Sequence, residues 1–267
     1  MKQNLKVSHL IEWLESKAEE QDFSKTCDTL KIGESERRVQ KVAVAMFATP
    51  AVIKSAMEWG AEFMIVHEPL YYNHFDTHSD EKVETAKRAL LEKSGMTVYR
   101  YHDHPHAAKQ DMIAFGELKQ MKLTGAVEYT DTFDLVRIAL DQETTARELA
   151  QKLEETLNIK HIRIAGALDK PLKKISCMFG APGNASQLNE LKSDSCELLI
   201  SGEVCEWSLC EYVRDASELG FTKAVFALGH AGSERDGMSC LAEQIKVQFP
   251  DVDVRYFECG EVYSYTD

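Results

Sequence analysis

Short apolar runs alternate with amphipathic stretches along the first part of the chain. The runs have the length of strands, and the stretches repeat their apolar residues at helical spacing. We expect strands at 39–47, 63–66 and 97–101, with helices at 50–59 and 81–94. Thr49-Pro50 and Gly60 are typical start and stop signals for the first helix. This alternation indicates a parallel or mostly parallel sheet with helices against it.

The later part of the chain continues the alternation with less regular spacing. We expect strands at 133–139, 161–164 and 171–178, and a helix at 145–157. The last part predicts a strand at 224–228, a helix from Ser233 to Gln248 and a strand at 252–257. The whole chain therefore predicts an α/β fold.

Imidazole and carboxylate side chains gather where the predicted strands end. Six of the nine histidines fall between His67 and His106. His67-Glu68 follows the first short run, and His230 ends a later one with Glu234 a helical turn beyond. The candidates after the strand at 97–101 are His102, Asp103, His104 and His106. Imidazole and carboxylate groups at three strand ends, along one edge of the sheet, are what a transition-metal site requires. Histidines scattered over the surface would not recur at the end of each strand.

Two stretches of the chain repeat one another. Met-Phe-x-x-Pro occurs at 46–50 and again at 178–182, each time between a predicted strand and a predicted helix. The run AEFMIVHE at 61–68 is echoed by CELLISGE at 196–203. We interpret this as an internal duplication of a strand–helix–strand unit, although any two buried units of this kind look alike.

The duplication predicts two similar α/β domains. Residues 1–125 and 216–267 form the first, which carries the metal ligands, and residues 126–215 form a second domain inserted in it. If the halves face each other, Glu203 borders the site outside the ligand set. Glu206 is better explained as an exposed helix residue.

Charge and cysteine content narrow the class of protein. The net charge of −13 and the pI near 5.2 argue against a nucleic-acid surface, which needs clustered Lys and Arg. Seven cysteines without paired spacing indicate reduced thiols and a cytoplasmic location. The N-terminal stretch is an amphipathic helix rather than a signal peptide, and no apolar run approaches the length that crosses a bilayer. His74 and His78 lie in a polar loop, which is either a mobile flap over the site or, as we favour, a plain part of the surface.

Four motifs together give the chain a family resemblance. They are CDTLKIG at Cys27–Gly33, the stretch Val44–Tyr72, SGEVCEW at Ser201–Trp207 and GHAGSE at Gly229–Glu234. With them the chain resembles the Nif-three-like family, also known as GTP cyclohydrolase I type 2 homologues, in its short form, which lacks the additional inserted domain of longer relatives. The resemblance implies two α/β domains with a metal site in the cleft between them. It also implies two adjacent divalent ions and a toroidal homohexamer.

The resemblance also implies roles for single residues. His67, His230 and Glu234 match the family's metal ligands, and His102 matches a site residue. Glu68 stands where the family has His, and His106 stands where it has Asp. Because the two changes are opposite, we infer a compensated ligand exchange that leaves the total ligand charge unchanged. Asp103 and His104 are expected just outside the ligands, where they could relay protons.

The resulting hypothesis is a metal-dependent hydrolase that acts on a nucleotide or a phosphate-ester-like small molecule through a water activated by two metal ions. Zinc, iron or manganese would suit the mixed nitrogen and oxygen ligands. No catalytic residue is assigned, and no phosphate-binding loop supports nucleotide binding independently. The alternatives are a non-catalytic metal-binding scaffold or regulatory protein acting through protein partners, and an inactive fold with core histidines.

The expected assembly is a homo-oligomer, a hexamer built from dimers. Leu70, Tyr71 and Tyr72 follow the first ligands and are candidates for its apolar contacts. They could equally cover the core beside the site.

Overall fold

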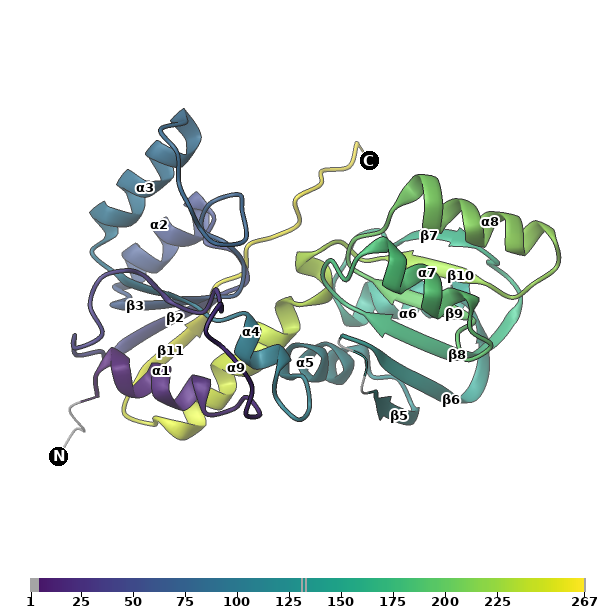
Figure 1. The fold of residues 1–267 in the computed structure, drawn as a ribbon, viewed down its shortest axis with the longest axis horizontal. Coiled ribbons are helices and arrows are strands. Elements are labelled where there is room, and N and C mark those ends of the chain that lie inside the picture. The colour runs from purple at the N-terminus through teal and green to yellow at the C-terminus, as the bar shows by residue number, and fades with distance from the viewer. Residues whose placement is uncertain (1–4, 131, 133, 267) are drawn as a thin grey trace. The chain divides into compact units, whose positions relative to one another are not determined.

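The computed structural model describes residues 5–130, 132 and 134–266. The chain divides into two compact units, drawn in Figure 1. The first unit comprises Met1–Gly116 and Gly237–Gly260, and the second comprises Glu117–Asp236 and Glu261–Asp267. None of the helices within the described ranges is long and apolar enough to cross a membrane.

The first unit is built on a five-stranded sheet with the order β1-β4-β3-β2-β11. Its strands are β1 (Leu30–Ile32), β2 (Lys41–Ala45), β3 (Phe63–Val66), β4 (Thr97–Arg100) and β11 (Asp253–Tyr256). All neighbours are parallel except β1, which pairs antiparallel with β4. Every residue of β3 and β4 is buried. Continuous burial is typical of a parallel sheet with both faces covered.

Helices cover both faces of this sheet, with α2 (Pro50–Trp59) and α3 (Lys82–Ser94) on one face and α1 (Val7–Glu15) and α9 (Arg235–Gln248) on the other (Figure 1). The short helix α4 (Asp103–His106) follows β4, and α5 (Met112–Met121) begins in the first unit and ends in the second. The Thr49 side chain accepts a hydrogen bond from the Val52 N–H, and Gly60 ends α2 in the left-handed conformation at φ 82°. The start and stop signals predicted for α2 are therefore confirmed.

The second unit contains a six-stranded sheet with the order β5-β6-β8-β9-β10-β7. Its strands are β5 (Gly125–Tyr129), β6 (Val136–Thr145), β7 (Arg163–Gly166), β8 (Pro171–Met178), β9 (Leu198–Ser201) and β10 (Ala224–Ala227). The central strands β8, β9 and β10 run parallel, and the outer strands pair antiparallel. Its helices are α6 (Ala146–Thr156), α7 (Asn184–Lys192) and α8 (Glu211–Glu218), with a π-helical turn at Glu206–Cys210 and a 3-10 turn at Ala231–Ser233.

The α/β class with two sheets is confirmed, and the division of the chain differs from the one expected. The second unit begins at Glu117 and extends to Asp236, whereas the sequence predicted an inserted segment of 126–215. The reason is strand pairing, because β10 hydrogen-bonds to β9 and β7 and so belongs to the second sheet. His230 and Glu234 are consequently residues of the second unit, not of the first.

Several element boundaries also differ. The expected strand at 133–139 is β6, which continues to Thr145, and Phe133 lies outside the described residues. Strand β7 begins two residues later than predicted. Strands β1 and β5 and helices α4 and α5 had no counterpart in the sequence prediction. These are short or weakly amphipathic elements, so their apolar pattern is faint.

Both units contain the predicted strand–helix–strand motif, as β2-α2-β3 and as β8-α7-β9, with the two strands parallel in each. In both units an N–H after the second strand donates to a carbonyl after the first strand, but the accepting residue stands at a different position of the Met-Phe-x-x-Pro motif. The Glu68 N–H donates to the Met46 carbonyl at 3.0 Å, and the Glu203 N–H donates to the Gly180 carbonyl at 2.8 Å. A duplicated origin remains our interpretation of this likeness.

Candidate metal centre

His67 is placed by the end of strand β3. Its side chain is fully buried, and its Nδ1 lies 3.0 Å from the Tyr101 carbonyl oxygen. Tyr101 is itself fixed, because its N–H donates to the Val66 carbonyl at 2.8 Å. A carbonyl oxygen only accepts, so Nδ1 carries the hydrogen and Nε2 presents a lone pair.

His102 and His106 stand at the two ends of the short helix α4. The His102 Nδ1 lies 2.9 Å from Asp103 Oδ1, and the His106 Nδ1 lies 2.8 Å from Asp111 Oδ2. The other oxygen of Asp111 accepts the Ile113 and Ala114 N–H groups at the start of α5. All three histidines thus offer Nδ1 to an acceptor, which is the usual way a protein orients a metal-binding imidazole.

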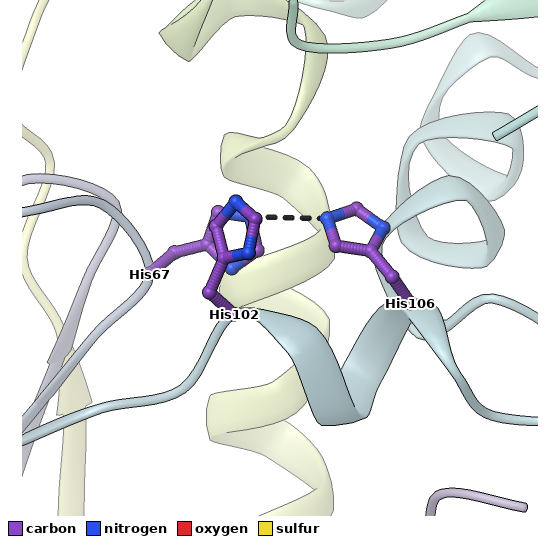
Figure 2. Close-up of side chains that lie close together, drawn as sticks. All are labelled: His67, His102 and His106. Carbon is purple, nitrogen blue, oxygen red and sulfur yellow. Dashed lines mark hydrogen bonds between the residues drawn. The ribbon is translucent and has the colours of Figure 1, made fainter. Parts of the chain in front are cut away.

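The three imidazoles converge, as Figure 2 shows. The ring of His102 stacks on that of His67 with centroids 4.6 Å apart, and the His106 ring lies 5.1 Å from His67. The Nε2 atoms of His67 and His106 are 3.3 Å apart. Two nitrogens bound to one tetrahedral zinc ion are expected at about 3.3 Å from each other, given bonds of about 2.0–2.1 Å. One nitrogen of each ring lies within 4.8 Å of the others, so the donor set fits a divalent ion.

Asp28 fixes the backbone that carries these rings. Its carboxylate accepts the N–H groups of His102, Asp103 and His104, at 2.6, 2.9 and 2.9 Å. Burial opposes ionisation of this acid, but hydrogen bonds from the His104 ring and from these backbone groups lower the pKa of Asp28 below its usual value. The side chain is therefore an anion at neutral pH, and it holds the turn into α4.

Asp103 and His104 both serve this turn. Asp103 accepts from Thr26 Oγ1 and the Cys27 N–H besides facing His102, and these hydrogen bonds keep its pKa well below the usual value although burial opposes ionisation. His104 is buried, stacks on Phe23 at 3.8 Å and lies 2.7 Å from Asp28. Both residues therefore hold the turn, and their part in relaying protons stays a prediction.

Glu68 lies beside the three imidazoles. Its Oε1 is 3.8 Å from His102 Nε2, and its Oε2 is 3.8 Å from Arg100 Nη2. Arg100 is only 1% exposed, and its Nε donates to the His67 carbonyl at 3.0 Å. The buried guanidinium of Arg100 thus lies within ion-pair distance of the Glu68 carboxylate.

The second unit brings together His230, Glu234 and Glu203. The His230 Nδ1 lies 2.8 Å from Glu203 Oε1, and its Nε2 lies 3.3 Å from Glu234 Oε2. Glu203 thus contacts the predicted ligand His230, and its place outside the ligand set stays a prediction. Glu206 is exposed and pairs with Arg163 at 3.3 Å, which confirms it as an ordinary surface residue.

Glycines allow the close packing around this group. Gly180 has φ 61°, and a Cβ atom there would overlap the Glu234 carboxylate. A Cβ atom at Gly202 would overlap the Gly180 carbonyl oxygen and lie within 2.5 Å of Ser233 Oγ. Ser233 Oγ in turn accepts the Gly180 N–H at 3.0 Å and donates to the His230 carbonyl. The turn after β8 therefore fixes both His230 and Glu234.

The predicted site residues thus form two groups, one in each unit. The first unit joins His67, His102 and His106 with Glu68 beside them, and the second joins His230 with Glu234. That all of these form a single centre stays a prediction. His74 and His78 are exposed, as expected.

Two important residues escaped the sequence analysis. Asp28 and Asp111 fix the imidazoles although neither follows a predicted strand. Asp111 carries the signal of a helix cap, since it precedes the apolar start of α5. Asp28 stands inside the CDTLKIG motif, which was used only for the resemblance.

Comparison with known proteins identifies the family of this chain. The family model Duf34/NIF3 (NGG1p interacting factor 3) matches residues 5–261. The chain is 25% identical over 239 residues to a GTP cyclohydrolase 1 type 2 homolog of Clostridium perfringens, covering 87% of both chains. It is 22% identical to the protein of the same name from Clostridium acetobutylicum, covering 91% of this chain and 90% of that one.

Solved structures show the same fold. Protein ybgI superposes with a TM-score of 0.76 at 20% identity, covering 97% of this chain and all of the other. Protein SA1388 of Staphylococcus aureus superposes with a TM-score of 0.75 at 16% identity, covering 98% of this chain and 99% of the other. Reduced HcgD from Methanocaldococcus jannaschii superposes with a TM-score of 0.74 at 17% identity, covering 95% of this chain and 97% of the other. Motifs, fold and family model agree, and the chain belongs to the Duf34/NIF3 family.

Proposed function

We propose that this chain is a metal-dependent hydrolase that acts on a nucleotide or a phosphate-ester-like small molecule. The observation that carries the proposal is the convergence of His67, His102 and His106, each with Nδ1 facing an acceptor. Such a set is built to bind a cation through Nε2. The name of the Clostridium relatives, GTP cyclohydrolase 1 type 2 homolog, supports the substrate class.

The three imidazoles would hold zinc, iron(II) or manganese, of which imidazole suits zinc and iron best. A bound ion of this kind supplies a water of lowered pKa and stabilises negative charge on the reacting group. The resemblance predicts a second ion, with His230 and Glu234 among its ligands. Within the second unit these two residues already lie 3.3 Å apart, as a pair of ligands would.

The protein's own residues have separable tasks in this proposal. Asp28, Asp103 and Asp111 hold the turn and the rings. Glu68 is kept beside the imidazoles by Arg100, where it binds the ion or accepts a proton from the attacking water. A Glu68→Gln variant separates these two tasks, because a lost ligand lowers metal content and a lost base lowers turnover alone.

The experiment is an assay of the metal-loaded chain on a panel of nucleotides and phosphate esters, with zinc content measured in parallel. We expect turnover that is abolished by chelation and by His67→Ala. Full metal occupancy without turnover on any member of the panel would contradict the hydrolase and favour the metal-binding scaffold.

A hexameric assembly is also proposed, from the resemblance alone. Its expected contact residues need correction, because Leu70 and Tyr71 are buried at 0% and 5% exposure and belong to the core of the first unit. Of the three, Tyr72 is exposed, at 69%. Light scattering at micromolar concentration measures the mass, and a monomer would contradict the proposal.

A further inference from the structure

The loop between β3 and α3 presents two rings to solvent on a closed backbone turn. His74 and Phe75 stand at its tip, and Phe75 is 64% exposed. Asn73 closes the turn beneath them, since its side chain accepts the N–H and hydroxyl of Thr77 at 3.0 Å and donates to the Thr77 carbonyl at 2.5 Å. The tip is therefore held by several hydrogen bonds rather than left free.

A buried ion-pair network anchors this loop. Asp76 adopts φ 57°, accepts the Leu70 N–H at 2.5 Å and pairs with Lys31 at 2.9 Å. Arg100 lies 3.5 Å from Asp76 and also donates to the His74 carbonyl. Burying these charges is costly unless they are paired. Because Arg100 also contacts Glu68, the loop and the imidazole group share one anchor.

The rings of the loop continue those of the imidazole group. Phe75 lies edge-on to His74 with centroids 4.9 Å apart, and His74 lies edge-on to His102 at 5.9 Å. His102 in turn stacks on His67 at 4.6 Å. An unbroken series of ring contacts thus runs from the candidate metal ligands to an exposed phenyl group.

A single exposed phenylalanine is ordinary on a protein surface. Phe75 differs because its loop is anchored by buried charges and its ring joins the series that ends at the imidazoles. A rigid loop that displays an aromatic ring loses little entropy on binding and offers a flat apolar surface beside a polar site.

We propose that His74 and Phe75, which we call the ring platform, determine substrate specificity by stacking a heteroaromatic ring while another part of the same molecule reaches the imidazole group. The inference rests on the proposed function and names its substrate class. The ligand is a nucleotide-like molecule, with a planar base at the platform and a phosphate-bearing end toward His67 and His102. An acyclic phosphate ester or a sugar phosphate has no planar base and would make no stacking contact with the ring platform.

The test compares two probes on the zinc-loaded full chain. One is 2-aminopurine riboside 5′-monophosphate, which carries a fluorescent base, and the other is ribose 5-phosphate, which carries none. Isothermal titration gives both affinities, and quenching of the 2-aminopurine reports stacking. We expect Phe75→Ala to weaken binding of the nucleotide about tenfold or more and to relieve the quenching, as loss of a stacked aromatic does. Binding of ribose 5-phosphate should change less than about twofold.

Tyr72→Ala is the matched control. Tyr72 belongs to the same loop and is 69% exposed, but its ring lies 5.6 Å from Lys87 Nζ instead of joining the series. We expect it to leave both affinities unchanged, and Phe75→Trp to restore nucleotide binding. Equal loss for both probes, or no loss for the nucleotide, would overturn the platform and leave the hydrolase proposal standing. Failure of both probes to bind the zinc-loaded wild-type chain would instead overturn the substrate class and the platform together.

Discussion

The two units place a histidine beside a glutamate at matching strand ends, but they hold the pair by different means. Glu68 and His102 follow β3 and β4 in the first unit, and Glu203 and His230 follow β9 and β10 in the second. The first pair depends on buried charges, above all Asp28 and Arg100. The second depends on glycines that allow the backbone to approach the Glu234 carboxylate.

This difference predicts how the group of each unit fails. A turn held by buried charged side chains is sensitive to any substitution that removes one of their hydrogen-bonding atoms. The buried partner of that atom is then left without a hydrogen bond. Close packing around a glycine is sensitive to added volume instead. Substitutions that alter charge should therefore damage the first unit most, and those that add a methyl group should damage the second.

The largest effect is expected from Gly180→Ala. The added Cβ would overlap the Glu234 carboxylate, and the positive φ adds strain of about 1–2 kcal/mol. We expect unfolding free energy to fall by about 3 kcal/mol and His230 and Glu234 to lose their geometry, measured by urea unfolding and metal content.

Gly183→Ala is the matched control for this substitution. Gly183 also has a positive φ, 91°, but a Cβ there would meet nothing within 4 Å. The Gly183→Ala variant should lose only the unfolding free energy that corresponds to backbone strain, and its metal content should equal that of the wild type. Equal losses for the two variants would show that packing against Glu234 is unimportant.

Asp111→Asn should weaken metal binding about 10- to 100-fold, the usual effect of removing a group that orients a metal-binding histidine. Asparagine offers one carbonyl oxygen, so it cannot both accept His106 Nδ1–H and cap α5 as the carboxylate does. Zinc titration against a competing chelator measures the change.

Glu81→Gln provides the comparison for Asp111. Glu81 likewise accepts the first N–H groups of a helix, those of Val83 and Glu84 at the start of α3, but its side chain contacts no candidate ligand. The zinc affinity of the Glu81→Gln variant should equal that of the wild type. A similar loss in both variants would trace the effect to helix stability and not to His106.

The smallest effect, opposite in sign, is expected from Glu117→Gln in the second unit. Burial, followed by the charge of Asp236, raises the pKa of Glu117 well above its usual value. A raised folded-state pKa means that the acid's contribution to stability is present below about pH 4, its unfolded pKa, and is lost as pH rises toward the folded pKa. The glutamine stays neutral and still accepts the Asp236 N–H. We expect the variant to be more stable than the wild type at pH 8 and nearly equal to it at pH 4, as measured by urea unfolding.

Asp28 should behave in the opposite way. Its folded-state pKa is lowered, so its contribution is present above about pH 4 and is lost as pH falls through the folded pKa. Asp28→Asn should therefore be destabilised at pH 7 and approach the wild type in acid. Urea unfolding at several pH values checks both variants, and parallel curves for the two would contradict the assignment of one anion and one neutral acid.

The sequence predicted the elements whose signals are local. Strands β3 and β8 have the predicted bounds, and α2 begins and ends at its cap residues. The position of His67, His102 and His106 at strand ends also followed from the apolar runs. Asp28 and the extent of the second unit did not, because they depend on contacts between residues distant in the chain. Such pairings leave no periodic pattern.

The turn at 102–106 shows the same limit. The residues after His102 form the helix α4, although the sequence gives no helical pattern there. His102 and His106 stand one helical turn apart and share a side, while His104 points to Asp28. The helical conformation of 102–106 is stabilised by hydrogen bonds to the Asp28 carboxylate, which lies far away in the sequence.

X-ray absorption at the zinc edge of the zinc-loaded chain tests the central claim most directly. We predict imidazole nitrogens at about 2.0–2.1 Å, with the number falling, or the zinc lost, in His102→Ala and His106→Ala. His78→Ala, which removes an exposed histidine paired with Arg88, should leave the spectrum unchanged. A spectrum that is the same in all three variants, or one with sulfur at about 2.3 Å, would contradict a centre built on His67, His102 and His106.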